Sequence, residues 1–287
     1  MIELITQPLG YDIFVRSLLA VVIVGIVCAV IGTFVVLKGL AFIGDAISHA
    51  AFPGVVAAYL LGGSYVIGAA IAAVSTALAT RWITQRGGIR SDTSIGVLFA
   101  GMFALGIFMF SSIRGYVGDL FAFLVGNVLA ISPTDLVALV ILASVTLVLI
   151  AILWKELLYA TFDPLGAAAS GLRVELLEYL FLALVALTIV ISLQAVGIIL
   201  VVAMLVTPAA AAQLLTVRFG RLVLVAVAIS VASSIVGLYL SFWLDVASGA
   251  TIVLTQSAAF VVALFVGPRR GLLARRAPVP TATAAAE

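Results

Sequence analysis

Residues 17–37 read SLLAVVIVGIVCAVIGTFVVL, a run of 21 residues without a charged side chain. As an α-helix, a run of this length spans about 30 Å, which matches the hydrocarbon core of a bilayer. Similar runs recur along the 287-residue chain, which is 65% hydrophobic and 9% charged, with a mean hydropathy of +1.39. In a soluble domain roughly a quarter of the residues are charged. The composition therefore excludes a soluble globular protein and predicts an integral membrane protein.

Ala, Val, Leu, Ile and Gly dominate the apolar runs, which favours helices packed through small residues over the alternating strands of an outer-membrane barrel. The predicted fold class is all-α, a polytopic membrane protein with eight or nine transmembrane helices. The lower count stays open because residues 194–197 leave almost no loop between two of the candidates. The nine candidate spans are Ser17–Leu37, Ala41–Leu61, Tyr65–Ile83, Thr93–Ser112, Thr134–Trp154, Leu176–Ala195, Gly197–Leu215, Leu222–Leu244 and Ala250–Val266.

The flanking segments complete the domain organisation. Residues 1–16 are expected to lie outside the membrane, residues 17–267 to form the transmembrane domain, and residues 268–287 to form a disordered cytoplasmic tail. The apolar segment Leu120–Ile131 is too short to cross a bilayer, so we expect a half-helix or an interfacial segment there.

The basic residues predict the orientation, because Lys and Arg are retained on the cytoplasmic side. A cytoplasmic C-terminus leaves only Arg16 and Arg114 outside. We therefore expect a multi-pass protein of a prokaryotic plasma membrane, with its C-terminus in the cytoplasm. The basic residues collected on that side are Lys38, Arg81, Arg86, Arg90, Lys155, Arg173, Arg218, Arg221, Arg269, Arg270, Arg275 and Arg276.

The sharpest functional candidates are Asp45 and His49, which fall inside an apolar run, where ionisable side chains are costly. Their spacing of four residues puts both on one face of a helix. A carboxylate oxygen and an imidazole nitrogen so placed could bind one divalent cation, and this ligand mixture suits manganese, iron or zinc better than magnesium or calcium. The competing interpretation is a local hydrogen bond that satisfies a buried or interfacial histidine.

His49 is the only histidine in the chain, so one copy cannot supply a shell of four ligands from this pair. A two-fold homodimer with Asp45 and His49 at its axis would supply two carboxylates and two imidazoles. Among the weaker candidates, Gln194 and Asn127 could line a pathway or form hydrogen bonds between helices, and the second is favoured. Asp135 is expected to be a solvated residue at the outer surface.

Residues 161–172 form part of the longest internal hydrophilic connection and are assigned to the cytoplasmic side. Asp163 followed by Pro164 can begin a short helix as its N-cap and first-turn proline, and Gly171 can end it. The stretch Ala167-Ala168-Ala169 would offer a low-profile surface to a partner. The alternative is a cytoplasmic loop capped only for solubility.

The chain also lacks the Gly-x-x-x-x-Gly-Lys-Ser/Thr phosphate-binding loop, because its only lysines are Lys38 and Lys155, in the contexts Leu37-Lys38-Gly39 and Trp154-Lys155-Glu156. Any ATP hydrolysis must therefore belong to another subunit. No permanently bound cofactor and no nucleic acid partner are expected.

Three motifs resemble the membrane subunits of manganese, zinc and iron ABC importers, the family that works with cluster A-I metal-binding proteins. They are residues 44–54 (GDAISHAAFPG), residues 161–171 (TFDPLGAAASG) and residues 196–210 (VGIILVVAMLVTPAA). The resemblance runs from the first span to Pro268. It implies a homodimeric permease of the type II importer architecture, which receives a metal ion from an extracytoplasmic binding protein and is driven by cytoplasmic ATP-binding subunits.

By this resemblance Asp45 and His49 fall on the metal pathway, and Phe162, Asp163, Pro164, Ala168 and Gly171 on the segment that couples to the ATPase. The residues around His49 look more like the manganese and iron branch, while zinc stays possible. Two alternatives remain. One is a secondary transporter that exchanges metal for protons, and the other is a membrane enzyme with a catalytic metal, which the absence of an accompanying nucleophile or base disfavours.

Overall fold

The computed structural model describes residues 2–113 and 128–267, and within these ranges every regular element is a helix. Nine helices there are long and apolar enough to cross a membrane. The all-α class and the higher of the two predicted span counts are therefore confirmed for the described residues. The spans are α2 (Asp12–Leu37), α3 with α4 (Ile43–Ala50 and Phe52–Leu61), α5 (Tyr65–Gly87), α6 (Ser91–Ser111), α8 (Pro133–Ile152), α11 (Val174–Val196), α12 (Ile198–Leu215), α13 (Phe219–Leu244) and α14 (Ser248–Val266).

Short helices lie between or before these spans. They are α1 (Ile2–Leu9), a 3-10 turn η1 (Val128–Ala130), α9 (Trp154–Phe162) and α10 (Pro164–Ala169). Most of the half-helix predicted at Leu120–Ile131 lies outside the described residues, as do Arg114 and Asn127. Of that segment only η1 and Ile131 are described, and the backbone carbonyl of Val128 accepts a hydrogen bond of 2.7 Å from Ser17 of α2.

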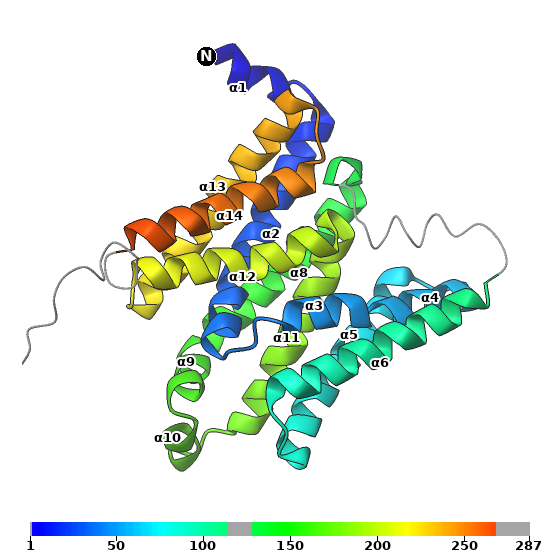
Figure 1. Ribbon diagram of the computed structural model, residues 1–287, viewed down its shortest axis with the longest axis vertical. Coiled ribbons are helices and arrows are strands. Elements are labelled where there is room, and N and C mark those ends of the chain that lie inside the picture. The colour runs from blue at the N-terminus through cyan, green and yellow to red at the C-terminus, as the bar shows by residue number, and fades with distance from the viewer. Residues whose placement is uncertain (1, 114–127, 268–287) are drawn as a thin grey trace, which may run out of the picture.

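Helix α2 occupies the centre of the bundle and packs against α8, α11, α12 and α13 (Figure 1). Its crossing with α12 is very close, because a Cβ atom at Gly32 would lie only 1.8 Å from the carbonyl oxygen of Leu205. Helices α13 and α14 pack on each other and on α12. Helices α3 to α6 form a lobe at the right of Figure 1, and this lobe joins the bundle where α3 and α5 contact α11.

Two differences between the helix boundaries and the predicted spans matter most for the site. Helix α2 begins at Asp12 rather than Ser17, so part of the segment predicted to lie outside the membrane continues the first helix. The second span is divided at Ala51, whose backbone stays helical (φ −67°, ψ −26°). The reason is Pro53, which has no amide hydrogen and deprives the carbonyl of His49 of its usual donor four residues later. The division therefore falls directly beside the candidate metal ligands.

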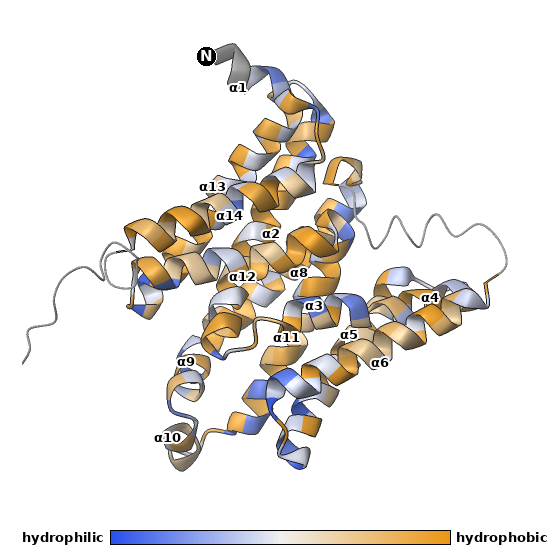
Figure 2. Ribbon diagram, in the orientation of Figure 1, coloured by the Kyte–Doolittle hydropathy of each residue, from blue (hydrophilic) through white to orange (hydrophobic). Residues whose placement is uncertain are grey.

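The hydrophilic segments gather at helix ends, as at the turn between α5 and α6, while the long helices are mostly apolar (Figure 2). The ends of α2 and α5 and the segment between α9 and α10 line one cavity of about 300 Å³. The ends of α2, α9 and α12 line a second cavity of about 380 Å³. The ends that carry Lys38 and Arg81 and the end of α12 before Arg218 thus lie around two cavities that share Leu37.

Candidate metal site and coupling helix

The local structure leaves Asp45 and His49 as the two partly open residues of α3. The other six residues of this helix, at positions 43, 44, 46, 47, 48 and 50, are all buried. The side chain of Asp45 is 47% exposed and that of His49 is 28% exposed. Phe42, one turn before Asp45 on the same face, is 73% exposed. The open face of α3 in a single chain therefore consists of Phe42, Asp45 and His49.

The two candidate ligands lie together as their spacing predicts. His49 Nε2 and Asp45 Oδ1 are 3.5 Å apart, which is longer than an ordinary hydrogen bond of about 2.7–3.2 Å. Two ligands on one tetrahedral ion, with bonds of about 2.0–2.2 Å, stand about 3.4 Å apart. The pair therefore has the separation of two neighbouring metal ligands.

The described residues supply no further ligand to this pair, since they contain no group of three or more His, Cys, Asp or Glu side chains that could hold a metal ion. Cys28 is buried elsewhere, where its Sγ lies 3.8 Å from Ser192 Oγ. A divalent ion with four or more ligands would thus need donors from outside the described part of one chain.

The imidazole of His49 lies against α6. Its ring makes edge contacts with Phe99 and Phe103, with centroid distances of 5.3 and 5.1 Å and interplanar angles of 76° and 77°. These two phenylalanine rings are nearly parallel, at 3° to each other. The sequence does not single them out, because a phenylalanine in an apolar helix carries no signal of its own.

The segment predicted to contact the ATPase contains the short helix that its Asp-Pro start predicts. Asp163 Oδ1 accepts a hydrogen bond of 2.8 Å from the amide of Gly166, so Asp163 is the N-cap and Pro164 the first residue of α10. Gly171 ends the segment with φ +89°, a left-handed conformation that favours glycine. Helix α10 lies at the lower end of the molecule in Figure 1, and the turn between α5 and α6 lies at the same end, further to the right.

The surface of α10 differs from the predicted one in one residue. Ala167 is fully buried, because it faces the neighbouring helices rather than solvent, so the expected Ala167-Ala168-Ala169 surface is wrong at that position. Ala168 is exposed, and Leu165, which the sequence analysis passed over, is 83% exposed. Phe162 is 63% exposed and makes an edge contact with Phe219 of α13. The projecting apolar residues of this segment are therefore Phe162 and Leu165.

An ion-pair cluster lies beside the coupling segment. Glu178 of α11 pairs with Arg81 of α5 and, at 3.7 Å, with the ammonium of Lys38 at the end of α2. All three side chains are largely buried, and they line the 300 Å³ cavity together with Thr161 and Pro164. Burial lowers the pKa of Lys38, and the Glu178 carboxylate partly opposes this shift. Charge counting placed Lys38 and Arg81 on the cytoplasmic side without showing that they share a carboxylate.

At the start of α8 and the end of α11 the prediction for Asp135 is wrong and that for Gln194 is confirmed. Gln194 of α11 donates a hydrogen bond of 2.9 Å to Asp135 Oδ1, so Gln194 connects two helices as expected. Asp135 is not simply solvated, because it also forms a capping box with Ser132 at the start of α8. The Ser-Pro-Thr-Asp sequence at residues 132–135 carried this capping signal.

Known proteins resemble the chain over nearly its whole length. A manganese transport system membrane protein, MntC of Halalkalibacterium halodurans, is 46% identical over 94% of this chain and 92% of its own length. The chelated iron transport system membrane protein YfeC of Yersinia pestis is 41% identical over 96% of this chain and 94% of its own length. Both names describe membrane components of metal transport systems.

Solved structures agree with this similarity. The structure of PsaBC from Streptococcus pneumoniae in complex with a Fab matches with a TM-score of 0.83 and 36% identity, over 94% of this chain and 98% of the matched chain. A metal-chelate type ABC transporter in an inward-facing conformation matches with a TM-score of 0.69. At 15% identity, the second match shows the fold alone.

Within the described residues, nine apolar helices, one of which is the central helix α2, define a multi-pass membrane protein with an acid–histidine pair on an open helix face. The sequence profile of the ABC 3 transport family matches residues 10–267, and the chain belongs to this family. It is thus the membrane permease component of a metal-type ABC importer. It is not an enzyme, and ATP hydrolysis belongs to a separate subunit.

Proposed function

We propose that the chain forms a homodimeric permease in which Asp45 and His49 of both copies coordinate a manganese or iron ion during import, with manganese favoured and zinc possible. The observation that carries the proposal is the 3.5 Å separation of His49 Nε2 and Asp45 Oδ1 on the open face of α3. One chain leaves this pair incomplete and partly exposed, and a second copy would add two more donors of the same kinds. The metal ion is the cargo of the permease and passes through this site.

Energy coupling in this proposal enters through α10. The permease would contact a cytoplasmic ATP-binding subunit with the projecting residues Phe162 and Leu165 and the exposed Ala168, while Asp163, Pro164 and Gly171 hold the helix in shape. ATP binding and hydrolysis would then open the metal site alternately to an extracytoplasmic metal-binding protein and to the cytoplasm. The convergence of the ends of α2, α5, α9 and α12 supports a cytoplasmic α10 and a cytoplasmic C-terminus.

Uptake into proteoliposomes tests the proposal against proton-coupled exchange. The permease is reconstituted with its ATPase and binding protein, and uptake of Mn²⁺ is measured with ATP, without ATP, and with a proton gradient alone. Competition by Fe²⁺ and Zn²⁺ then ranks the metals. We expect Mn²⁺ uptake that requires ATP, whereas uptake driven by the proton gradient alone would contradict the ATP-driven mechanism.

A further inference from the structure

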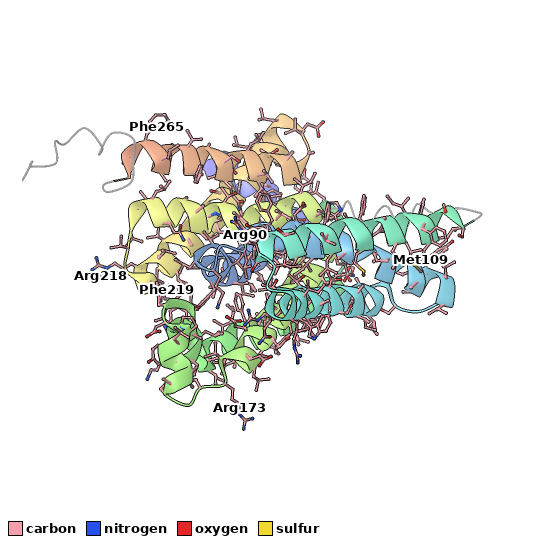
Figure 3. All side chains as sticks on the ribbon, turned by 60° about the horizontal axis from the view of Figure 1, so that its bottom comes forward. Arg90, Met109, Arg173, Arg218, Phe219 and Phe265 are labelled. Atoms are coloured by element: carbon pink, nitrogen blue, oxygen red, sulfur yellow. The ribbon has the colours of Figure 1, made fainter. Side chains whose placement is uncertain are left out.

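Helix α6 packs on the metal-site helices through a single stripe of residues. Ile95, Phe99, Phe103, Gly106 and Phe110 recur at intervals of three or four, which places them on one face of a helix. Gly106 marks the closest approach, because a Cβ atom there would lie 2.5 Å from a ring carbon of Phe52 in α4. In Figure 3, α6 runs from Arg90 to Met109 across the lobe that also holds α4 and α5.

Two members of this stripe contact the candidate metal ligand itself. Phe99 and Phe103 present parallel rings to the imidazole of His49, which stands nearly perpendicular to both, with centroid distances of 5.3 and 5.1 Å. Phe103 also contacts Phe52 of α4, at 6.1 Å. Phe110 lies two turns further along the stripe, away from His49, and packs on Phe52 at 6.0 Å. The stripe thus contains two rings that touch the candidate ligand and one that contacts α4 at a distance from it.

Two ring contacts restrict how the imidazole can turn. Rotation of the His49 side chain toward α6 would drive the imidazole into Phe99 or Phe103, so these contacts favour the observed orientation, in which Nε2 lies 3.5 Å from Asp45 Oδ1. A ligand that already points at the metal loses less rotational freedom when the ion binds. Phenylalanine offers neither a donor nor a charge, so the contact fixes the direction of the ring without competing for the ion.

We propose that Phe99 and Phe103 are positioning residues for His49, and that α6 thereby determines how tightly the permease binds its metal. This inference rests on the proposed metal site.

The test measures Mn²⁺ binding to the purified full-length permease by electron paramagnetic resonance, which reports both the dissociation constant and the symmetry of the bound ion. Phe99→Leu, Phe103→Leu and the double variant keep an apolar side chain but remove the ring. We expect the double variant to bind Mn²⁺ roughly tenfold more weakly, the scale seen when a ligand loses its supporting residue, with a changed spectrum. Phe103→Tyr retains the ring and should restore both readouts.

Two control variants distinguish an effect on the orientation of His49 from a general loss of packing between helices. Phe110→Leu weakens the same helix interface away from His49, and Phe108→Leu alters a residue of α6 that is 71% exposed. Both should keep the wild-type dissociation constant and spectrum, although Phe110→Leu should lower the melting temperature. If a leucine variant fails to fold, Phe→Met replaces it, since methionine is also apolar and has no ring.

The outcomes distinguish the inference from the proposed function. If Asp45→Ala and His49→Ala lose Mn²⁺ while the leucine variants keep wild-type affinity and spectrum, the positioning role is wrong and the metal site stands. If Asp45→Ala and His49→Ala bind Mn²⁺ as the wild type does, or if the wild type binds none, the proposed metal site is wrong. The positioning role of Phe99 and Phe103 is then wrong as well.

Discussion

At the scale of single residues, Asp45 and His49 carry the proposed transport. Replacing either by alanine removes one ligand per copy and two per dimer, so Asp45→Ala and His49→Ala should abolish metal uptake. Both side chains are partly exposed and neither fills space in the hydrophobic core, so the variants should still insert and dimerise. Uptake in proteoliposomes, read beside the elution volume of the purified protein, measures the two effects. Wild-type uptake by either folded variant would contradict the metal pathway.

Gln256 of α14 gives a second prediction at this scale. Its side chain is fully buried, and neither polar atom of its amide has a hydrogen-bond partner within the described residues. Because an unsatisfied buried polar group costs about 1–3 kcal/mol, Gln256→Leu should raise the free energy of unfolding by about that amount. The thermal melting point in detergent measures this. Gln213→Leu is the control, since Gln213 lines an open cavity, and a Gln256→Leu variant less stable than this control would show the prediction wrong.

At this scale the sequence predicted the candidate metal ligands but not the residues that pack against them. Asp45 and His49 stand out because charged or titratable groups are rare in an apolar run, and their spacing alone places them on one face. Phe99 and Phe103 lie some 50 residues further along the chain, and their partner is decided only by how α6 crosses α3. Helical spacing puts Phe108 on a different face, and it is exposed, but spacing alone does not show which face of α6 meets α3.

At the scale of helices, hydropathy located all nine spans but not the pairing of the charges at their ends. Lys38, Arg81 and Glu178 come from three different helices, and a charge near the end of a span looks the same in sequence whether it meets water or another helix. Similarly, the alanines of α10 are indistinguishable in sequence, although Ala167 is buried and Ala168 is exposed. Tertiary packing decides both cases, and a single sequence does not encode it locally.

The shared carboxylate leads to a prediction about how α2, α5 and α11 hold together. Glu178→Gln would leave two neighbouring cations, Lys38 and Arg81, largely buried without their counter-charge. We expect a loss of roughly 1–3 kcal/mol in stability, since breaking one side of a partly buried ion pair leaves uncompensated charge. The melting temperature checks this, with Glu175→Gln as the control, because Glu175 lies on α11 and is exposed. Equal melting temperatures for the two variants would show that the cluster contributes nothing to stability.

Helix α10 gives the prediction on energy coupling. Ala168→Arg or Leu165→Asp places a charge on the surface proposed to meet the ATPase, so metal binding should persist while stimulation of ATPase activity by transport is lost. Gly171→Glu should have the same result, but its left-handed backbone adds strain of its own. The paired measurement is Mn²⁺ binding to the permease and ATPase activity of the reconstituted complex. Gly63→Glu, at the exposed turn between α4 and α5, is the charge control. Full coupling in all three variants would place the docking surface elsewhere.

At the scale of the whole molecule, the open face of α3 calls for a second copy. Phe42, on the same face, is apolar and 73% exposed, and lipid would satisfy it equally well. The case for a second copy therefore rests on Asp45 and His49, which would be costly against lipid. Because one histidine per chain cannot complete a shell, the dimer axis is expected to pass near Asp45 and His49. The two His49 side chains would then have to approach within roughly 10 Å in at least one state, given metal–ligand bonds of about 2 Å.

This geometry predicts one bound ion for every two chains and a specific cross-link. Metal analysis of the purified dimer gives the stoichiometry directly. Phe42→Cys should join two chains through a short thiol-reactive cross-linker, whereas Leu254→Cys, which is exposed on α14, should not. The native Cys28 is fully buried and leaves the background low. One ion per chain, with no cross-link at position 42 in any state of the transport cycle, would mean that each protomer binds metal by itself. The missing ligands would then have to come from its own chain beyond the described residues, from water, or from the binding protein that delivers the ion.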